Sequence, residues 1–293
     1  MNILTFDLEE WFHILNNPST DNESSWGSFE YRLRENIDRI LLLLDESNNI
    51  ATFFCLGWVA RKYPEIIKEI HSLGHEIGSH SNQHQLIYRH DRNFFKKDLE
   101  LSINTLQNIT GSKIRSYRAP GFSLIKDTLW VFEELALQGI EYDCSIFLGN
   151  HSHGGRIKEF GTKPAVVKFG DFEIKEFPVN SFKFFNKEVA FSGGGYFRFL
   201  PYSLIRLLMN RNKYIMTYFH PRDFDFQQPM ISDLNYIRKF KSYYGLKDSF
   251  KKAKKFVRDY DFVTLEHANK LIDWKKAPTY QIIGQELHQE GHI

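Results

Sequence analysis

The sequence predicts an α/β fold in which helices cover a parallel β-sheet that is either open or closed into a barrel. Short apolar segments alternate with amphipathic ones up to about residue 146, the order expected when helices join parallel strands. With 293 residues, the chain can form one large barrel or two ordinary domains. The residues best suited to chemistry follow predicted strands, where the side chains of a parallel α/β barrel converge on one face.

The first half of the chain supplies the regular part of this fold. Runs of apolar and β-branched or aromatic residues predict strands at 3–6, 51–56, 76–79, 113–118 and 142–146. Apolar residues at helical spacing predict helices at 33–44, 64–73, 92–109 and 125–137. Gly74 is a candidate C-cap of the second helix. Residues 14–27 are rich in Asn, Ser, Pro and Asp and predict a loop.

The pattern changes between about residues 150 and 200, where we expect an insertion of hairpin and loop. Residues 151–155 predict a flexible loop, and residues 166–177 predict a hairpin that turns at Gly170-Asp171. The glycines of Gly193–Arg198 allow unusual torsions, so this segment is either a tight loop or backbone around a ligand. After this insertion we expect helices at 201–210, 233–245 and 266–275, and strands at 213–219 and 261–264. We therefore expect one domain over residues 1–275 and a polar, mobile tail over residues 276–293.

Composition excludes several classes of protein. The net charge of +2 gives no reason to expect nucleic-acid binding. No apolar run reaches the roughly 18 residues needed to span a bilayer. Asp7 follows Met1 too closely to leave room for a signal peptide, so we expect a cytoplasmic protein. Cys55 and Cys144 lie in apolar surroundings and are expected to be buried free thiols. The oligomeric state stays open.

His80 and His84 are the first candidates for a metal site. Spaced four residues apart, they can lie on one side of a helical turn. Neutral imidazole is the commonest protein ligand for metals, and one carboxylate from residues 5–10 would complete an open three-ligand site. Zn²⁺ suits this set best, although other transition metals stay open.

The other reactive residues suggest hydrolysis at such a site. A bound ion polarises a carbonyl and lowers the pKa of water. A second carboxylate can act as general base and a separate histidine as general acid. Arg118 could pair with the base carboxylate. Taken alone, His220 would by default be a core histidine with satisfied hydrogen bonds. Trp11 and His13 could line a sugar site or pack in the core, and packing is the better interpretation for Trp11.

Four segments together resemble the motifs of a known family, the NodB-homology polysaccharide deacetylases of carbohydrate esterase family four. They are Thr5-Phe6-Asp7-Leu8-Glu9, His80-Ser81-Asn82-Gln83-His84, Arg118-Ala119-Pro120-Gly121 and Tyr218-Phe219-His220-Pro221. The resemblance covers residues 5 to about 225. Further segments, 176–179 and 193–202, are similar to the subgroup associated with exopolysaccharide and O-antigen synthesis.

This resemblance implies a distorted (β/α) barrel of roughly seven or eight strands and a role for each residue. Asp7 would be the general base, Arg118 would orient it, and His220 would be the general acid. Glu9, His80 and His84 would hold the metal, with Glu10 as an alternative to Glu9. The residues expected to contact the substrate are Pro120, Gly121, Phe122, Tyr196 and Arg198.

The chain also departs from the family pattern. Leu8 separates Asp7 from Glu9, whereas the usual motif has adjacent aspartates. Either Gly121 or Phe122 would supply the backbone N–H for the oxyanion. The motif that supports the acid histidine has no clear match, so Asp143 or Asp223 is a guess for that role.

The function implied by the resemblance is removal of an N-acetyl group from an amino sugar. The sugar would belong to a bacterial surface polysaccharide or to a lipid- or nucleotide-linked precursor. Metal-bound water would attack the amide carbonyl, with Asp7 as base and His220 as acid. The alternatives are a deformylase or an O-acetyl esterase on the same scaffold, or a carbohydrate-binding barrel without catalysis.

Overall fold

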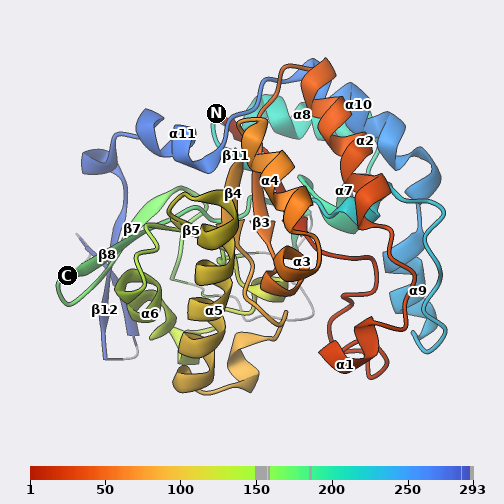
Figure 1. The fold of residues 1–293 in the computed structure, drawn as a ribbon. Coiled ribbons are helices and arrows are strands. Elements are labelled where there is room, and N and C mark those ends of the chain that lie inside the picture. The colour runs from red at the N-terminus through yellow and green to blue at the C-terminus, as the bar shows by residue number, and fades with distance from the viewer. Residues whose placement is uncertain (149–156, 158, 185–186, 285, 291–293) are drawn as a thin grey trace.

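The structure is a computed structural model, and it describes residues 1–148, 157, 159–184, 187–284 and 286–290 (Figure 1). The strands are β1 (Asn2–Ile3), β2 (Thr5–Leu8), β3 (Thr52–Cys55), β4 (Glu76–Ser79), β5 (Ser116–Tyr117), β6 (Tyr142–Asp143), β7 (Ala165–Phe169), β8 (Phe172–Glu176), β9 (Ser181–Phe184), β10 (Lys187–Ala190), β11 (Ile215–Met216), β12 (Thr279–Ile283) and β13 (Glu286–Gln289). The predicted loop of residues 151–155 lies outside the described residues.

Helices cover the sheet and connect its strands (Figure 1). They are α1 (Glu23–Trp26), α2 (Leu33–Glu46), α3 (Gly57–Lys62), α4 (Pro64–Ser72), α5 (Arg92–Thr110), α6 (Val131–Leu137), α7 (Gly194–Phe199), α8 (Tyr202–Arg211), α9 (Tyr236–Tyr243), α10 (Leu246–Asp259) and α11 (Leu265–Leu271). Short 3₁₀ turns are η1 (Ile87–Arg89), η2 (Pro120–Phe122), η3 (Lys126–Thr128), η4 (Pro221–Phe224) and η5 (Trp274–Lys276).

The sheet is parallel from β2 through β3, β4, β5 and β6 to β8. Every residue of β2 and β3 is buried, as expected for central strands covered on both faces. The amphipathic helices α2, α4 and α5 turn their apolar residues toward this sheet. Parallel strands in this order present all their carboxyl ends at one edge, which is where the predicted site residues lie.

The other edge of β2 closes the barrel. β1 pairs with β11, and Phe6 forms a parallel bridge with Phe219. Asn180 spans the remaining gap: its side-chain amide donates to the carbonyl of Tyr214 at 2.9 Å, and its oxygen accepts from the N–H of Met216 at 2.6 Å. One buried side chain thus replaces a pair of ladder hydrogen bonds between β11 and the segment that follows β8.

Several predicted elements differ from the structure. The expected helix at 125–137 is divided into η3 and α6, and the expected strand at 261–264 is reduced to a bridge between Val263 and Ile3. A helical turn, α1, stands within the expected loop. The hairpin of β7 and β8 is confirmed, with Phe169 opposite Phe172. A second hairpin, β9–β10, was not predicted.

The expectation of a polar, mobile tail after residue 275 is wrong for residues 279–289. They form the hairpin β12–β13, and β12 pairs in parallel with β7 (Figure 1). The overall polarity of the segment hides an alternation, because Tyr280, Ile282 and Leu287 are buried whereas the residues next to them are partly or fully exposed. The assignment of residues 1–275 to a single domain stays a prediction.

Two negative expectations can be compared with the described residues. Among them, no helix combines the length and the apolar character that a membrane crossing requires. Cys55 and Cys144 are both buried and free, as expected.

Candidate active site

The predicted site residues meet at the carboxyl edge of the sheet. Asp7 lies near the end of β2 with Glu9 just beyond it, His80 follows β4, Arg118 follows β5, and His220 follows the bridge formed by Phe219. A cavity of about 320 Å³ opens above them, and its walls also include residues from α7 and from the end of α9.

Glu9, His80 and His84 form a buried three-ligand cluster. Ligand atoms of the three side chains all lie within 4.8 Å of one another. His84 Nε2 lies 2.8 Å from Glu9 Oε2. His80 Nδ1 donates to the carbonyl of Arg118 at 2.8 Å, which leaves the Nε2 lone pair of His80 free for a ligand.

The protonation states of this cluster suit a divalent cation. Burial lowers the pKa of His80 to about 4, and the neighbouring His84 contributes to this shift. The carboxylates of Asp7 and Glu9 act in the opposite direction but do not cancel it. Burial alone would raise the pKa of Glu9, but the contact with His84 and the charge of His220 hold it well below its usual range. A neutral imidazole and an ionised carboxylate are the forms that bind metal. The residues present therefore fit the group that the resemblance implies.

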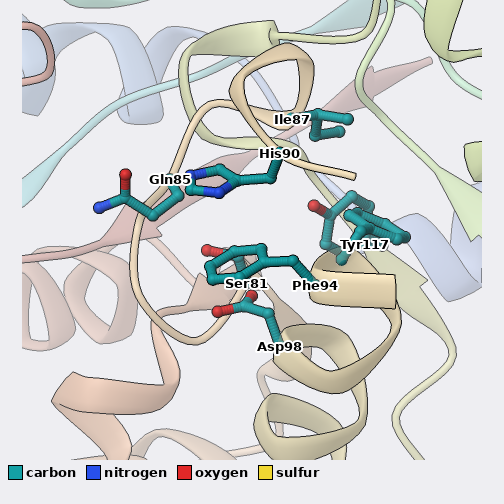
Figure 2. A pocket seen from close by; sticks show the side chains of 8 residues that line it. Ser81, Gln85, Ile87, His90, Phe94, Asp98 and Tyr117 are labelled. Atoms are coloured by element: carbon teal, nitrogen blue, oxygen red, sulfur yellow. The ribbon is translucent and has the colours of Figure 1, made fainter. Parts of the chain in front are cut away.

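The segment from His80 to His84 is a loop and not the helical turn that the spacing suggested. Ser81 and His84 have positive φ angles of 65° and 55°. Asp98 on α5 holds this loop, because its carboxylate accepts from the N–H of Asn82 at 2.8 Å and of Gln83 at 3.0 Å. Figure 2 shows Asp98 and Ser81 at the base of the loop, beside a cavity of only about 10 Å³. The strained loop is thus fixed from outside the cluster.

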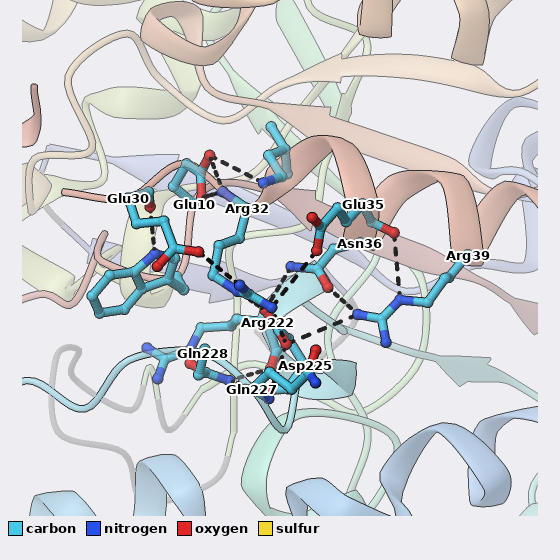
Figure 3. A network of polar contacts seen from close by, with 12 residues as sticks. Glu10, Glu30, Arg32, Glu35, Asn36, Arg39, Arg222, Asp225, Gln227 and Gln228 are labelled. Atoms are coloured by element: carbon cyan, nitrogen blue, oxygen red, sulfur yellow. Dashed lines mark hydrogen bonds and ion pairs between the residues drawn. The ribbon is translucent and has the colours of Figure 1, made fainter.

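Glu10, the alternative to Glu9, faces away from the cluster. Its carboxylate accepts from the N–H groups of Arg32 and Leu33, each at 3.1 Å, and so caps the start of α2 (Figure 3). The hydroxyl of Tyr63 is a further donor to it. The structure therefore brings Glu9, and not Glu10, to the two histidines.

Asp7 and Arg118 form a buried pair next to the cluster. Arg118 Nη1 donates to Asp7 Oδ1 and to Thr5 Oγ1, both at 2.7 Å. Arg118 is fully buried, and its guanidinium lies 4.3 Å from the centre of the Phe54 ring. This geometry holds one oxygen of Asp7 in place through a charge-assisted hydrogen bond.

His220 approaches the cluster from the opposite side. Its Nε2 lies 3.1 Å from Glu9 Oε1 and 3.7 Å from Asp7 Oδ2. Its Nδ1 donates to Asp223 Oδ2 at 3.2 Å. Burial opposes the charged form of His220, but the hydrogen bond to Asp223 and the charges of Glu9 and Asp7 raise its pKa to about 9. The ring is therefore held as a protonated group with Nε2–H directed toward the cluster.

Asp223, one of the two residues guessed as support for His220, is the one that contacts it. Asp143 lies elsewhere and accepts from the hydroxyl of Ser145 at 2.6 Å. Asp223 is itself ion-paired with Arg198, whose other N–H groups donate to the carbonyls of Lys241 at 2.7 Å and Tyr244 at 3.1 Å. Arg198 thus ties the histidine to the end of α9.

A polar network fixes the turn that follows His220. Asp225 accepts from Arg32 Nε at 2.6 Å and from Asn36 Nδ2 at 3.1 Å, so that η4 is attached to the first turn of α2. Figure 3 shows this network, with Arg32 between Glu10 and Asp225. Arg32 therefore links the segment that bears Glu9 and Glu10 to the turn that follows His220.

The five residues expected to contact substrate separate into two groups. Gly121, Phe122 and Arg198 line the cavity, whereas Pro120 and Tyr196 do not. Pro120 is buried, and Tyr196 is 37% exposed on the outer face of α7. Phe122 donates its N–H to the carbonyl of Ala119 at 3.0 Å. In the part of the chain that the structure describes, the N–H of Gly121 has no such acceptor.

His13 lines the cavity, whereas Trp11 packs in the core. The ring nitrogen Nδ1 of His13 accepts from the N–H of Glu10 at 3.2 Å, so the proton of the neutral ring resides on Nε2. That Nε2 is buried and has no hydrogen-bond partner among the described residues. Burial holds the pKa of His13 well below its usual value. His13 therefore presents a neutral donor beside His84.

Sequence reasoning missed several residues of the site. Asp98, Arg222 and Lys241 carry no motif of their own, and each reaches the site only through the packing of its helix or turn. The spacing of Asp223 three residues after His220 was the signal available for the supporting acid, because a side chain at that distance can turn back onto the first residue of a helical turn.

Comparisons with known proteins agree with this geometry. Residues 17–140 match the family model described as polysaccharide deacetylase, and residues 144–270 match a domain of unknown function, DUF3473. A peptidoglycan-N-acetylglucosamine deacetylase of Bacillus cereus is 30% identical over 97 residues, which are 33% of this chain and 35% of that protein. The chain thus spans about a third of this relative's length.

One solved structure shows the same fold, and a second is more distantly similar. A candidate polysaccharide deacetylase from Mycobacterium smegmatis has a TM-score of 0.62 at 18% identity, covering 97% of this chain and 95% of the other. A peptidoglycan deacetylase of Bacillus subtilis has a TM-score of 0.46 at 16% identity, covering 92% and 90% of the two chains. The first likeness confirms the predicted barrel. Residues 17–140 are therefore similar to the polysaccharide deacetylases, which is the family that the sequence motifs resemble.

Proposed function

We propose that this chain is a metal-dependent hydrolase that removes an N-acetyl group from an amino sugar. The observation that carries the proposal is the placement of Asp7 and His220 on two sides of the Glu9, His80 and His84 cluster, within one cavity. A base, an acid and an open set of metal ligands are the groups that amide hydrolysis requires.

The ligand set is Glu9, His80 and His84, and Zn²⁺ is the proposed ion. When bound, such an ion polarises the amide carbonyl and lowers the pKa of water toward neutrality. All three ligands are buried and two are imidazoles, which supports a transition metal over Ca²⁺ or Mg²⁺, since these prefer oxygen ligands.

The residues around the cluster have separate roles. Asp7 takes the proton of the attacking water, and Arg118 holds the carboxylate oriented for that step. Gly121 is the proposed backbone donor to the oxyanion, because the N–H of Phe122 is already bonded to Ala119. His220 then gives its Nε2 proton to the departing amine, and Asp223 holds the imidazolium until that transfer.

The proposed substrate is an N-acetylated glycan of a bacterial surface polysaccharide or its lipid- or nucleotide-linked precursor. The similarity to a protein described as a peptidoglycan-N-acetylglucosamine deacetylase supports an N-acetylated amino sugar. Membership of the exopolysaccharide and O-antigen subgroup and a cytoplasmic location belong to the same proposal, and the subgroup rests on the segments at 176–179 and 193–202.

Acetate release from N-acetylated glycans by the purified chain tests the proposal. We expect release that stops on chelation, returns with Zn²⁺, and falls about 10³-fold in Asp7→Asn protein, the range for loss of a general base. Asp171→Asn, which changes an exposed acid in the β7–β8 turn, is the matched control and should leave the rate unchanged. Normal turnover by Asp7→Asn would refute the assigned mechanism.

The same assay separates the alternatives. Release of formate, or of acetate from O-acetylated sugars only, would identify a deformylase or an esterase on this scaffold. Glycan binding without any hydrolysis, across metals and substrates, would identify a carbohydrate-binding barrel.

A further inference from the structure

One region of the surface is unusually apolar. Of the residues that the structure describes, 18 large apolar side chains are exposed, and nine of these lie between residues 196 and 244. We define the aromatic face as six of the nine, which come from α7, from α9 and from the residue after α9. They are Tyr196, Phe199, Tyr236, Ile237, Phe240 and Tyr244. Contiguous apolar surface of this kind marks an interaction site.

Helix α9 is the main part of this face. None of its residues is buried, although it carries four aromatic or aliphatic side chains. Tyr236 is 92% exposed, Ile237 69% and Phe240 54%. Residues 236, 237 and 240 share one side of the helix because they are one and four positions apart. A helix that turns its apolar side to water, and not to the core, is either unstable alone or covered by something else.

The face continues from α9 onto α7. The Phe240 ring lies 4.8 Å from the Tyr244 ring, and Tyr244 lies 5.7 Å from Phe199. These ring contacts join the two helices into one surface. Tyr196, expected from the sequence to contact substrate, belongs to this outer surface instead.

The aromatic face lies at the rim of the active-site cavity. The same two segments line the cavity with other residues, which are Gly194, Gly195 and Arg198 on one side and Lys241 and Ser242 on the other. A partner bound to the face would therefore lie directly beside the cluster of Glu9, His80 and His84.

The chain around α9 is strongly basic. Residues 236–258 contain nine Lys or Arg and a single acidic residue, Asp248, in a chain whose net charge is only +2. Lys241, Lys247 and Lys251 are exposed, and none has an acidic group within 4.0 Å among the described residues. Figure 1 shows that α9 and α10 lie on the same side of the molecule. The partner of this surface is therefore expected to be anionic.

We propose that the aromatic face and the basic segment around it bind the surface of an anionic lipid bilayer, with α9 lying in the plane of the interface. A helix with aromatic and aliphatic residues on one side and Lys or Arg on the other is the form that binds such a surface. Tyr and Phe favour the boundary between headgroups and acyl chains, and the lysines gain from anionic headgroups.

The bilayer is favoured over two other occupants. A soluble polyanion would satisfy the lysines but would leave Ile237 and Phe240 in water. A second copy of this chain would bring two basic segments together, and like charges across an interface are unfavourable. The proposal concerns binding only and does not rest on the deacetylase activity, so that either can fail without the other.

Sedimentation with vesicles tests the proposal on the full chain. We expect the protein to bind vesicles of phosphatidylcholine mixed with phosphatidylglycerol at least about tenfold more tightly than pure phosphatidylcholine vesicles, and to be released by salt. The double variant Ile237→Ser/Phe240→Ser should lose this binding. Lys247→Glu and Lys251→Glu should each weaken it by about fivefold or more, which is the equivalent of about 1 kcal/mol.

Matched controls test whether the loss of vesicle binding is specific to the aromatic face and its basic segment. Leu271→Ser changes an apolar residue of α11 that is 60% exposed, and Lys97→Glu changes an exposed lysine of α5; both should bind as the unchanged chain does. The circular dichroism spectrum should be the same for every variant.

Three results would overturn the proposal. The first is a folded chain that does not sediment with either kind of vesicle. The second is binding that survives Ile237→Ser/Phe240→Ser but is lost on charge reversal, which would indicate a polyanion. The third is a dimer in analytical ultracentrifugation that the same double variant dissociates, which would show that the face binds a second copy.

Discussion

The two sides of the candidate site are built in different ways. Asp7, Glu9, His80 and Arg118 follow parallel strands and are held by short contacts to the main chain or to one another. His220 follows the bridge at Phe219 and depends on a chain of ion pairs through Asp223 to Arg198, while a separate ion pair between Asp225 and Arg32 holds the turn that follows. We call the first the sheet-built side, because strand ends position its residues, and the second the charge-built side, because ion pairs position His220.

This difference indicates where each side is vulnerable. A strand end is fixed by many hydrogen bonds, so its side chains fail only when their direct partners are removed. A chain of ion pairs is sensitive to pH and to the loss of a single member, because each buried charge needs its partner. Substitutions on the two sides should therefore have different signatures.

The largest effect is expected on the sheet-built side, from Arg118→Met. Removing the guanidinium leaves Asp7 buried without its charged partner, which costs about 3–5 kcal/mol when a buried pair is broken. Activity should fall by about 10³-fold, and the midpoint of urea unfolding should fall with it. Arg115→Met, at an exposed arginine three residues earlier, is the control. An equal loss of activity and stability in that variant would show that the effect is not specific to Arg118.

The next effect should come from the loop that bears the histidines. Asp98→Asn removes the charged acceptor of two loop N–H groups, and loss of such supporting contacts typically costs 10–100-fold in metal affinity. Competition titration with a zinc chelator measures it. Glu100→Gln, on the same helix, should leave the affinity unchanged; unchanged affinity in Asp98→Asn would show that the loop holds its shape unaided.

On the charge-built side, Asp223→Asn should change a pH profile. An acid catalyst must be protonated, so activity falls as pH rises through the pKa of His220, which is about 9. Losing the Asp223 carboxylate lowers this pKa, so the alkaline limb of kcat should move to lower pH and the rate at pH 8 should fall about tenfold. Asp225→Asn, which does not contact His220, should leave the limb in place. If the alkaline limb of kcat does not move in Asp223→Asn, His220 is not the general acid.

The smallest effect concerns stability and His75, which directly precedes strand β4. Burial lowers the pKa of His75 to about 4, below its value in the unfolded chain. The folded form therefore binds fewer protons, and stability present above about pH 6.5 is lost as pH falls toward 4, by about 2 kcal/mol. His75→Asn should flatten this slope in urea unfolding, whereas His267→Asn, at an exposed site, should not. If the dependence of stability on pH is unchanged in His75→Asn, another residue causes the loss of stability in acid.

The sheet-built side was largely predictable from the sequence. The strands around Asp7, His80 and Arg118 appear as apolar runs, and the rule that parallel strands present their carboxyl ends together places the three residues at one edge. The choice between Glu9 and Glu10 was not predictable, because it depends on which carboxylate caps α2.

The charge-built side was less predictable for a physical reason. Arg198 pairs with Asp223, and Asp225 pairs with Arg32, which lies 193 residues earlier; such contacts between separate segments leave no periodic pattern in the sequence. The positive φ of Ser81 and His84 likewise arises from tertiary support by Asp98, which overrides the helical spacing of the two histidines. The hairpin at 279–289 was missed because its alternation is short.

The pairing of β1 and β2 with residues near 215–219 has a consequence for synthesis on the ribosome. The first strands to emerge have one edge whose partner is translated some two hundred residues later. Until then that edge is an open template for association with other chains. A nascent chain stopped near residue 140, where the first matched segment ends, would still have this edge uncovered, and we expect such a chain to associate with other chains.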